Sequence, residues 1–193
     1  MPTKQLSPEF ISDSSLNWAL EHISRFGDTD VLPISFEFRA YKSVWPGVLD
    51  ALRKIDLAKH ELGPAIRMMV PKHTTGYRSA AQLDPLDALL FSALVYEMSP
   101  SIEAFRLHAD RNVACAYRLD IKPDGQFFQK NTGWTSFHEQ SKTYAQQSWC
   151  KYVISADIND FYNQISHHRI QNALASAGIS GTAARFWRGF WAT

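Results

Sequence analysis

The chain has 193 residues, of which 45% are hydrophobic and 20% are charged, a composition that suits a globular protein of one or two domains. Its formal net charge of +1 excludes attraction of nucleic acid by overall charge, so any such site must be a local patch. The cysteines exclude a disulfide framework, and their positions match no metal-binding spacing. The N-terminus lacks the apolar core of a signal peptide, and the most apolar stretch, residues 88–96, is too short to cross a bilayer. We therefore expect a soluble cytoplasmic protein without a membrane partner.

The first part of the chain predicts two helices separated by an extended segment. Apolar residues at helical spacing indicate a helix over residues 16–26, which Gly27 should end. Residues 34–38 place Ile, Phe and Phe at alternate positions, which predicts an extended segment. The spacing of Val, Leu and Ile side chains predicts a second helix over residues 46–59.

The next part predicts a hairpin followed by a helix. Residues 65–70 and 78–83 have the composition of strands, and the polar loop between them is the expected turn. Asp84, followed by a proline, is typical of a helix start and predicts a third helix over residues 86–98.

A second extended pair and a fourth helix follow. Residues 114–121 and 126–129 flank the sequence Lys-Pro-Asp-Gly at 122–125, which is a strong turn signature. Residues 136–147 are amphipathic enough for a helix. The order of elements predicts a mixed α/β (α+β) fold without internal repeats.

Residues 151–170 are the most informative stretch for function. A β-prone run, residues 152–155, predicts a strand that ends near Asp157, and a helical pattern begins near His167. A carboxylate at a rigid strand end suits Mg²⁺, which prefers oxygen ligands. Asp157 is therefore a predicted metal ligand; the competing interpretation is an ordinary turn former or helix cap.

The same stretch contains the pattern Asp-x-x-x-Phe-Tyr-x-x-Ile-x-His, which resembles motif A of reverse transcriptases. Residues 70–87, with a Pro-Lys pair, a Gly-x-Arg turn and an Asp-led helix, resemble the fingers motif of bacterial reverse transcriptases. Residues 116–119 are similar to the next fingers element, an aromatic-Arg pair. Residues 16–37 are similar to the N-terminal extension of prokaryotic reverse transcriptases in the group associated with phage defence and abortive infection.

This resemblance implies the fingers and partial palm of a right-hand polymerase. It divides the chain into an N-terminal helical extension at 1–60, fingers at 61–150 and the start of the palm at 151–193. The implied activity is RNA-directed DNA synthesis, with Mg²⁺ as cofactor. The implied partners are an RNA template, a DNA or RNA primer and deoxynucleotides.

The resemblance also assigns roles around motif A. Asp157 and the backbone carbonyl of Ile158 would hold the metal, while Asp160 is expected to cap the turn, with membership of the same site as its alternative. Tyr162 resembles the residue that excludes a ribose 2′-hydroxyl from the nucleotide pocket. Its alternative role is that of an ordinary half-buried aromatic side chain at the end of a strand.

Three basic residues of the fingers receive roles in the same way. Lys72 and Arg78 would grip the incoming triphosphate, one as a point charge and the other as a planar fork. The alternative for both is a solvated basic hairpin. Arg118 would contact the template backbone, and a structural ion pair is the other interpretation.

The sequence departs from the family in one respect. A complete reverse transcriptase continues to a Tyr-x-Asp-Asp turn that supplies further metal-binding carboxylates, and no Asp-Asp pair occurs here. We therefore expect this chain to be inactive alone and to need a missing palm segment or a second polypeptide. Two other functions stay open: a non-catalytic RNA- or protein-binding module, and a stand-alone metal-dependent phosphotransferase, for which no second carboxylate cluster is present.

The last residues predict a further property. Phe186, Trp187, Phe190 and Trp191 lie at the four-residue spacing that places side chains on one helix face. Rings left facing water would form an apolar patch, so we expect self-association or a covering polypeptide, unless the helix folds back within the monomer.

Overall fold

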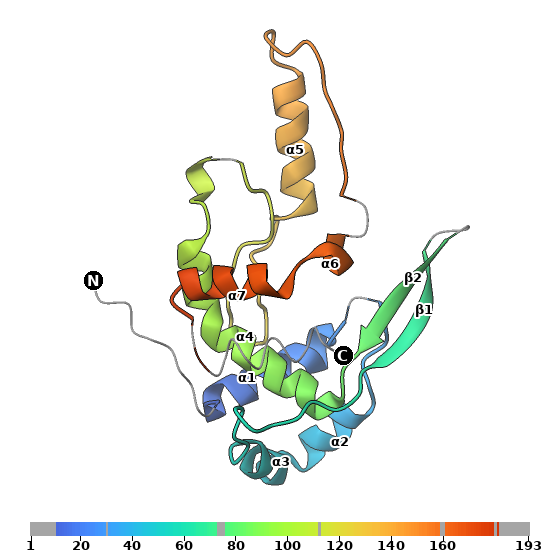
Figure 1. Ribbon diagram of the computed structural model, residues 1–193, viewed down its shortest axis with the longest axis vertical. Helices are drawn as coiled ribbons and strands as arrows, with labels where there is room; N and C mark the ends of the chain where they lie inside the picture. Colours follow the sequence, from blue (N-terminus) through green and yellow to red (C-terminus); the bar gives the residue numbers. More distant parts are fainter. Residues whose placement is uncertain are drawn as a thin grey trace.

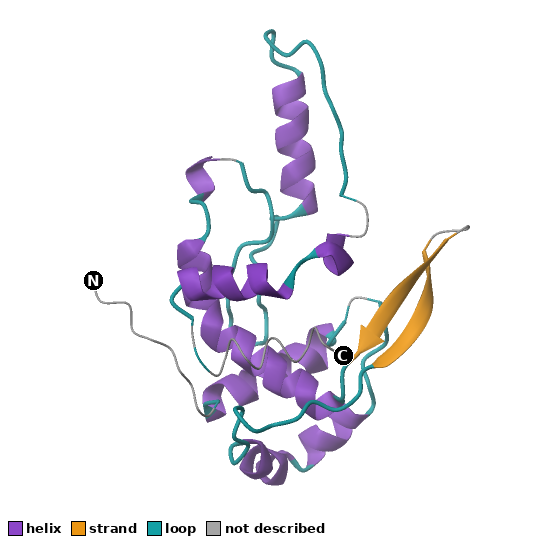
Figure 2. Ribbon diagram, viewed as in Figure 1, coloured by secondary structure: helices purple, strands orange, loops and turns teal. Residues whose placement is uncertain are grey.

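The fold is α+β, with helices and one two-stranded antiparallel hairpin in the part of the chain that the structure describes. The computed structural model describes residues 11–29, 31–72, 76–111, 113–158, 161–179 and 181. The helices form a body from which the hairpin and helix α5 project (Figures 1 and 2). Among the described residues, no helix is both long enough and apolar enough to cross a membrane.

Helix α1 (Asp13–Phe26) confirms the first predicted helix and extends it toward its N-terminus. It begins where the Ser12 hydroxyl accepts a hydrogen bond from the Ser15 backbone N–H, and it ends at Gly27, whose φ of 85° suits glycine. Its apolar face packs on α4 (Pro85–Phe105), and the two helices form the centre of the core. The core residues of these two helices are Leu16, Ala19, Leu20, Ile23, Ala88, Leu89, Leu90, Ala93, Leu94 and Met98.

Two predictions for the segment between α1 and the hairpin are wrong. Residues 34–38 are not one extended segment, because the chain enters α2 (Glu37–Ser43) and buries Phe38, while Phe36 is 77% exposed. The predicted helix at 46–59 is too long, because α3 (Trp45–Leu52) ends early. Beyond it, Asp56 accepts a hydrogen bond from the Ala58 backbone at 2.9 Å, a local turn that competes with helix formation.

The predicted hairpin is confirmed as β1 (Ile66–Lys72) and β2 (Gly76–Gln82). The loop that leads into it is fixed by the buried carboxylate of Asp87, in the first turn of α4. Asp87 accepts a hydrogen bond from the Gly63 backbone at 2.7 Å and contacts His60 Nε2 at 2.6 Å. A side chain of the helical body therefore sets the position of the hairpin.

Helix α4 begins as predicted, at an Asp84 cap, but continues seven residues past the predicted end. Pro100 lies inside it and cannot donate a hydrogen bond to the Tyr96 carbonyl. The buried Ser99 hydroxyl donates to that carbonyl instead, at 2.7 Å. This substitute bond explains why the helix continues through a proline that usually ends one.

The second predicted extended pair forms a loose hairpin. After the short 3₁₀ helix η1 (Ala109–Arg111), a single bridge pairs Leu119 with Phe128. The turn between them docks on α1, because Trp18 Nε1 donates to the Lys122 carbonyl at 2.9 Å and His22 Nδ1 lies 2.7 Å from the Gly125 carbonyl.

The C-terminal part contains α5 (Trp134–Ala145), α6 (Phe161–Gln164) and α7 (His167–Ser176). Helices α5 and α7 confirm two predictions, and Leu174 of α7 reaches the core. The predicted strand at 152–155 is wrong, because residues 151–158 form neither helix nor strand and are exposed. A β-prone run needs a neighbouring strand to pair with, and the described residues offer none there.

Candidate functional site

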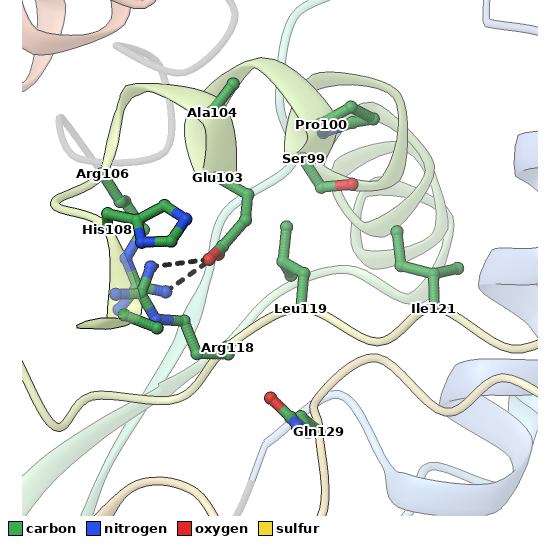
Figure 3. A pocket seen from close by; sticks show the side chains of 11 residues that line it. Ser99, Pro100, Glu103, Ala104, Arg106, His108, Arg118, Leu119, Ile121 and Gln129 are labelled. Carbon is green, nitrogen blue, oxygen red and sulfur yellow. Dashed lines mark hydrogen bonds and ion pairs between the residues drawn. The ribbon is translucent and has the colours of Figure 1, made fainter.

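A cavity with a volume of about 620 Å³ lies at the C-terminal end of α4 (Figure 3). The last turns of α4 form one wall, the segment around η1 forms another, and the bridge residues 118–129 close the third. Arg118, a predicted nucleic-acid contact, lines this cavity. The site is therefore built from three successive segments of one stretch of the chain, residues 99–129.

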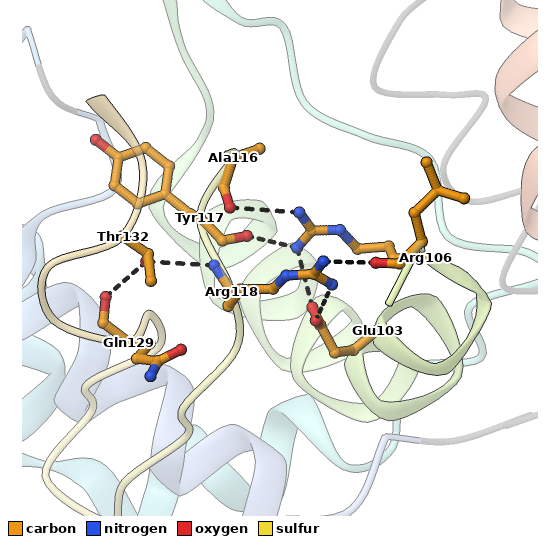
Figure 4. Close-up of polar contacts among 8 residues, drawn as sticks. Glu103, Arg106, Ala116, Tyr117, Arg118, Gln129 and Thr132 are labelled. Carbon is orange, nitrogen blue, oxygen red and sulfur yellow. Dashed lines mark hydrogen bonds and ion pairs between the residues drawn. The ribbon is translucent and has the colours of Figure 1, made fainter. Parts of the chain in front are cut away.

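One carboxylate and two guanidinium groups form the polar centre of the cavity (Figures 3 and 4). Glu103 Oε1 accepts from Arg118 Nη1 at 2.8 Å, and Glu103 Oε2 accepts from Arg106 Nη1 at 3.0 Å. Both guanidinium groups also donate to backbone carbonyls, Arg118 to Leu107 and Arg106 to Tyr117 and Ala116. The network thus joins the end of α4 to the loop that leaves it.

The electrostatics of this network favour an ionised carboxylate. Burial raises the pKa of Glu103, but the hydrogen bond from Arg118 and the charge of Arg106 outweigh it and hold the pKa below its ordinary value. A carboxylate of lowered pKa is a poor proton acceptor at neutral pH, so Glu103 is better suited to holding the two guanidinium groups than to acting as a general base. Two guanidinium groups against one carboxylate leave an excess of positive charge, which suits an anion at the cavity wall.

Arg118 was open to two interpretations from the sequence, and the structural ion pair is the one that the structure displays. Its side chain is 13% exposed, and Glu103 and Leu107 occupy its two terminal nitrogens. The Glu-x-x-Arg spacing of Glu103 and Arg106 is a helical ion-pair signal that sequence reasoning missed. Contact of Arg118 with a template backbone stays a prediction.

Lys72 and Arg78, the predicted triphosphate ligands, lie on opposite strands of the hairpin. Val70 pairs with Arg78, and Lys72 pairs with Gly76. Paired residues share a face of a hairpin, and residues two apart on a strand also share a face. The two cations therefore lie on one face as diagonal neighbours, about 7–8 Å apart, and both are exposed.

The motif A residues are only partly described. Asp157 and Ile158 lie in the exposed segment that leads from α5 toward α6. Tyr162 belongs to α6, but its side chain lies outside the described part of the structure, and Asp160 lies outside it entirely, as does the predicted aromatic helix at 184–191. The roles of Asp157, Ile158 and Tyr162 stay predictions.

Mg²⁺ requires more oxygen ligands than Asp157 and one carbonyl provide. Across the described residues, no three side chains of His, Cys, Asp or Glu gather closely enough to hold a metal ion. The described residues thus do not make a complete magnesium site. Binding of Mg²⁺ at Asp157 would need further ligands from outside the described residues.

Three groups of predicted residues therefore lie on separate parts of the structure: the hairpin pair, the Arg118 network and the Asp157 segment. No ion pair among the described residues connects one group with another. The chain matches no family model, and no curated protein or solved structure matches it.

Proposed function

We propose that this chain is the N-terminal portion of an RNA-directed DNA polymerase, a cytoplasmic reverse transcriptase that serves in antiviral defence. The observation that carries the proposal is the hairpin, which brings Lys72 and Arg78 to one exposed face. The residues are six positions apart, and only the observed register makes them neighbours. A point charge beside a planar guanidinium fork is a suitable receptor for a triphosphate.

In this proposal Asp157 is a metal ligand, the role that the resemblance to motif A gives it. In the complete polymerase Asp157 and the Ile158 carbonyl would hold Mg²⁺, whose charge would neutralise the charge that develops on the transferred phosphate. Because the described residues do not complete the metal site, we assign no catalytic step to this chain alone. The remaining ligands would come from a further palm segment or from a second polypeptide.

The exposure of residues 151–158 supports the same proposal. Tyr152 and Ile154 are each 89% exposed, and Val153 is 69% exposed, although all three are residues that strands usually bury. In a right-hand polymerase this segment would be a palm strand with neighbours on either side. Its exposure is the expected condition of such a strand where the described residues provide it with no neighbours.

A non-catalytic RNA- or protein-binding module is the second candidate function, and helix α5 favours it. No residue of α5 is buried, and Trp134 and Phe137 stack with their ring centroids 5.8 Å apart while facing solvent. Exposed rings are stacking platforms for unpaired bases and anchors for protein partners. This candidate needs no metal and no nucleotide triphosphate.

Binding of a deoxynucleoside triphosphate with Mg²⁺, measured by calorimetry, separates the two functions. The polymerase proposal expects measurable binding, which Lys72→Ala and Arg78→Ala each weaken about 10- to 100-fold, the usual cost of a lost charged hydrogen bond. Arg67→Ala is the matched control, because it removes the same charge from the opposite face of the hairpin. Equal weakening by all three variants, or none by any, would contradict the assignment of these residues.

A further inference from the structure

Residues 151–158 form an open length of backbone. Figure 1 shows this segment running from the far end of α5 back toward α6, and every one of its residues is exposed. Among the described residues, its backbone takes part in a single hydrogen bond, in which Cys150 Sγ donates to the Tyr152 carbonyl at 3.5 Å. Unpaired backbone that carries β-prone side chains is a template for a further strand.

The charges of the segment select the direction and the register of such a strand. Lys151 and Asp157 lie at its two ends and belong to none of the ion pairs among the described residues. When two copies run antiparallel with the two Ile154 residues opposite each other, each lysine faces the aspartate of the other copy. A shift by one residue in either direction would put Asp157 opposite Tyr152 or Cys150 instead. The segment is therefore complementary in charge to a second copy of itself.

The apolar side chains match in the same register. Alternate residues share one face of a strand, so Tyr152, Ile154 and Ala156 form an apolar face. In the paired copies Tyr152 lies opposite Ala156 twice, and the two Ile154 side chains meet at the centre. Because Tyr152 and Ile154 are each 89% exposed in the single chain, their pairing would remove apolar surface from water.

We propose that two copies of this chain associate through residues 151–158 as an antiparallel ribbon with a two-fold axis at Ile154. Two Lys151–Asp157 ion pairs close the ends of the ribbon. The interface is small, so the association is weak, with a Kd on the order of tens of micromolar. The inference does not depend on the proposed polymerase function, because Lys72 and Arg78 lie on the hairpin. Pairing would engage Asp157, and it would therefore compete with binding of a metal there.

Exchange of the two charges in the whole chain tests the pairing. Sedimentation equilibrium of the wild-type chain between about 5 and 500 μM should show monomers and dimers. Asp157→Lys and Lys151→Asp each create two like-charge pairs, so each should weaken dimerisation about tenfold or more. The double exchange restores unlike charges and should return the affinity to that of the wild type. Asp110→Lys is the matched control, because it changes the net charge as Asp157→Lys does, at an exposed site outside the segment.

A cysteine at the centre of the ribbon tests the register independently of charge. In a Cys150→Ser chain, Ile154→Cys would place two thiols opposite each other, with a Cα separation of about 4.5–5.5 Å that a disulfide can span. Tyr152→Cys is the matched control, because the two copies would hold its thiols four residues apart along the strands, about 13 Å. Mild oxidation should therefore link copies of the Ile154→Cys chain and leave the Tyr152→Cys chain monomeric on a non-reducing gel.

Four outcomes would overturn the proposal. They are a chain that stays monomeric throughout the concentration range, dimers that neither single exchange weakens, a double exchange that restores nothing, and equal cross-linking of the two cysteine variants. Dimers that are insensitive to the exchanges would place the interface elsewhere, such as at the aromatic residues of 186–191. Each of these outcomes is distinct from a failure of nucleotide binding at Lys72 and Arg78, which would contradict the polymerase proposal alone.

Discussion

Glu103 shows how a single carboxylate can hold two segments together at the cavity beside the end of α4. Both of its oxygens accept from guanidinium groups of the loop that follows α4, and its side chain is 27% exposed. Removal of the Glu103 charge from this partly buried network would leave the two guanidinium groups without a counter-charge, and this is the main reason that the network stabilises the fold. The sequence alone offered Arg106 at the right helical spacing, but the contribution of Arg118 depends on a loop path that no local pattern encodes.

Glu103→Gln should therefore lower the free energy of unfolding at pH 7 by about 1–3 kcal/mol. Because the pKa of Glu103 is lowered from 4.5 in the folded chain, its contribution is fully present above pH 4.5 and is lost as the pH falls through the folded value. Urea unfolding at pH 7 and at pH 3 measures this. A difference between wild type and variant that stays constant across that range would contradict the assignment.

At the scale of elements, local patterns sufficed where an element is defined by its own residues. The hairpin β1–β2 and helix α5 were predictable, because strand composition and helical spacing are properties of a short window. The prediction of an extended segment at 34–38 was wrong, because only burial of Phe38 in the core decides which aromatic side chain faces inward. The predicted length of α4 was too short. Ser99 compensates for the hydrogen bond that Pro100 cannot make, and the general rule that prolines end helices does not anticipate this.

The docking of the 122–125 turn on α1 yields a prediction at this scale. Gly125 has a φ of 84°, and an added Cβ would lie 2.6 Å from the His22 backbone nitrogen. Gly125→Ala should therefore destabilise the fold by about 2–4 kcal/mol, because it combines backbone strain with displacement of the turn from Trp18 and His22. Thermal or urea unfolding measures the loss.

Gly47→Ala is the control for this substitution. A Cβ at Gly47 meets nothing within 4 Å, and the residue lies within α3, so the change should stabilise the helix by up to about 1 kcal/mol. A destabilisation of the same size at both glycines would show that the turn is not anchored as described.

For the whole molecule, the candidate site was predicted in parts but not as an assembly. The hairpin was predictable from composition, but the register that brings Lys72 and Arg78 to one face was not, because Lys72 was expected in the loop and lies in β1. The distance of these cations from Asp157 depends on how the segment after α5 is placed. That placement needs strand partners, which the described residues do not supply.

Because the sequence has no Asp-Asp pair and the described residues complete no metal site, we expect the isolated chain to extend no primed RNA template with Mg²⁺ and deoxynucleotides. Primer extension followed on a gel measures this, with Asp157→Ala alongside. The two samples should be indistinguishable. Robust incorporation that Asp157→Ala abolishes would mean that the remaining ligands lie within this chain after all.

The open segment at 151–158 also limits how copies of this chain could pair with each other. Lys151 and Asp157 lie at the two ends of its apolar run, so an antiparallel pair of copies with these residues opposite each other would match unlike charges. A parallel, in-register stack would instead align lysine with lysine and aspartate with aspartate in every layer. The two charges thus disfavour parallel stacking of the segment, whereas an antiparallel partner strand would match them.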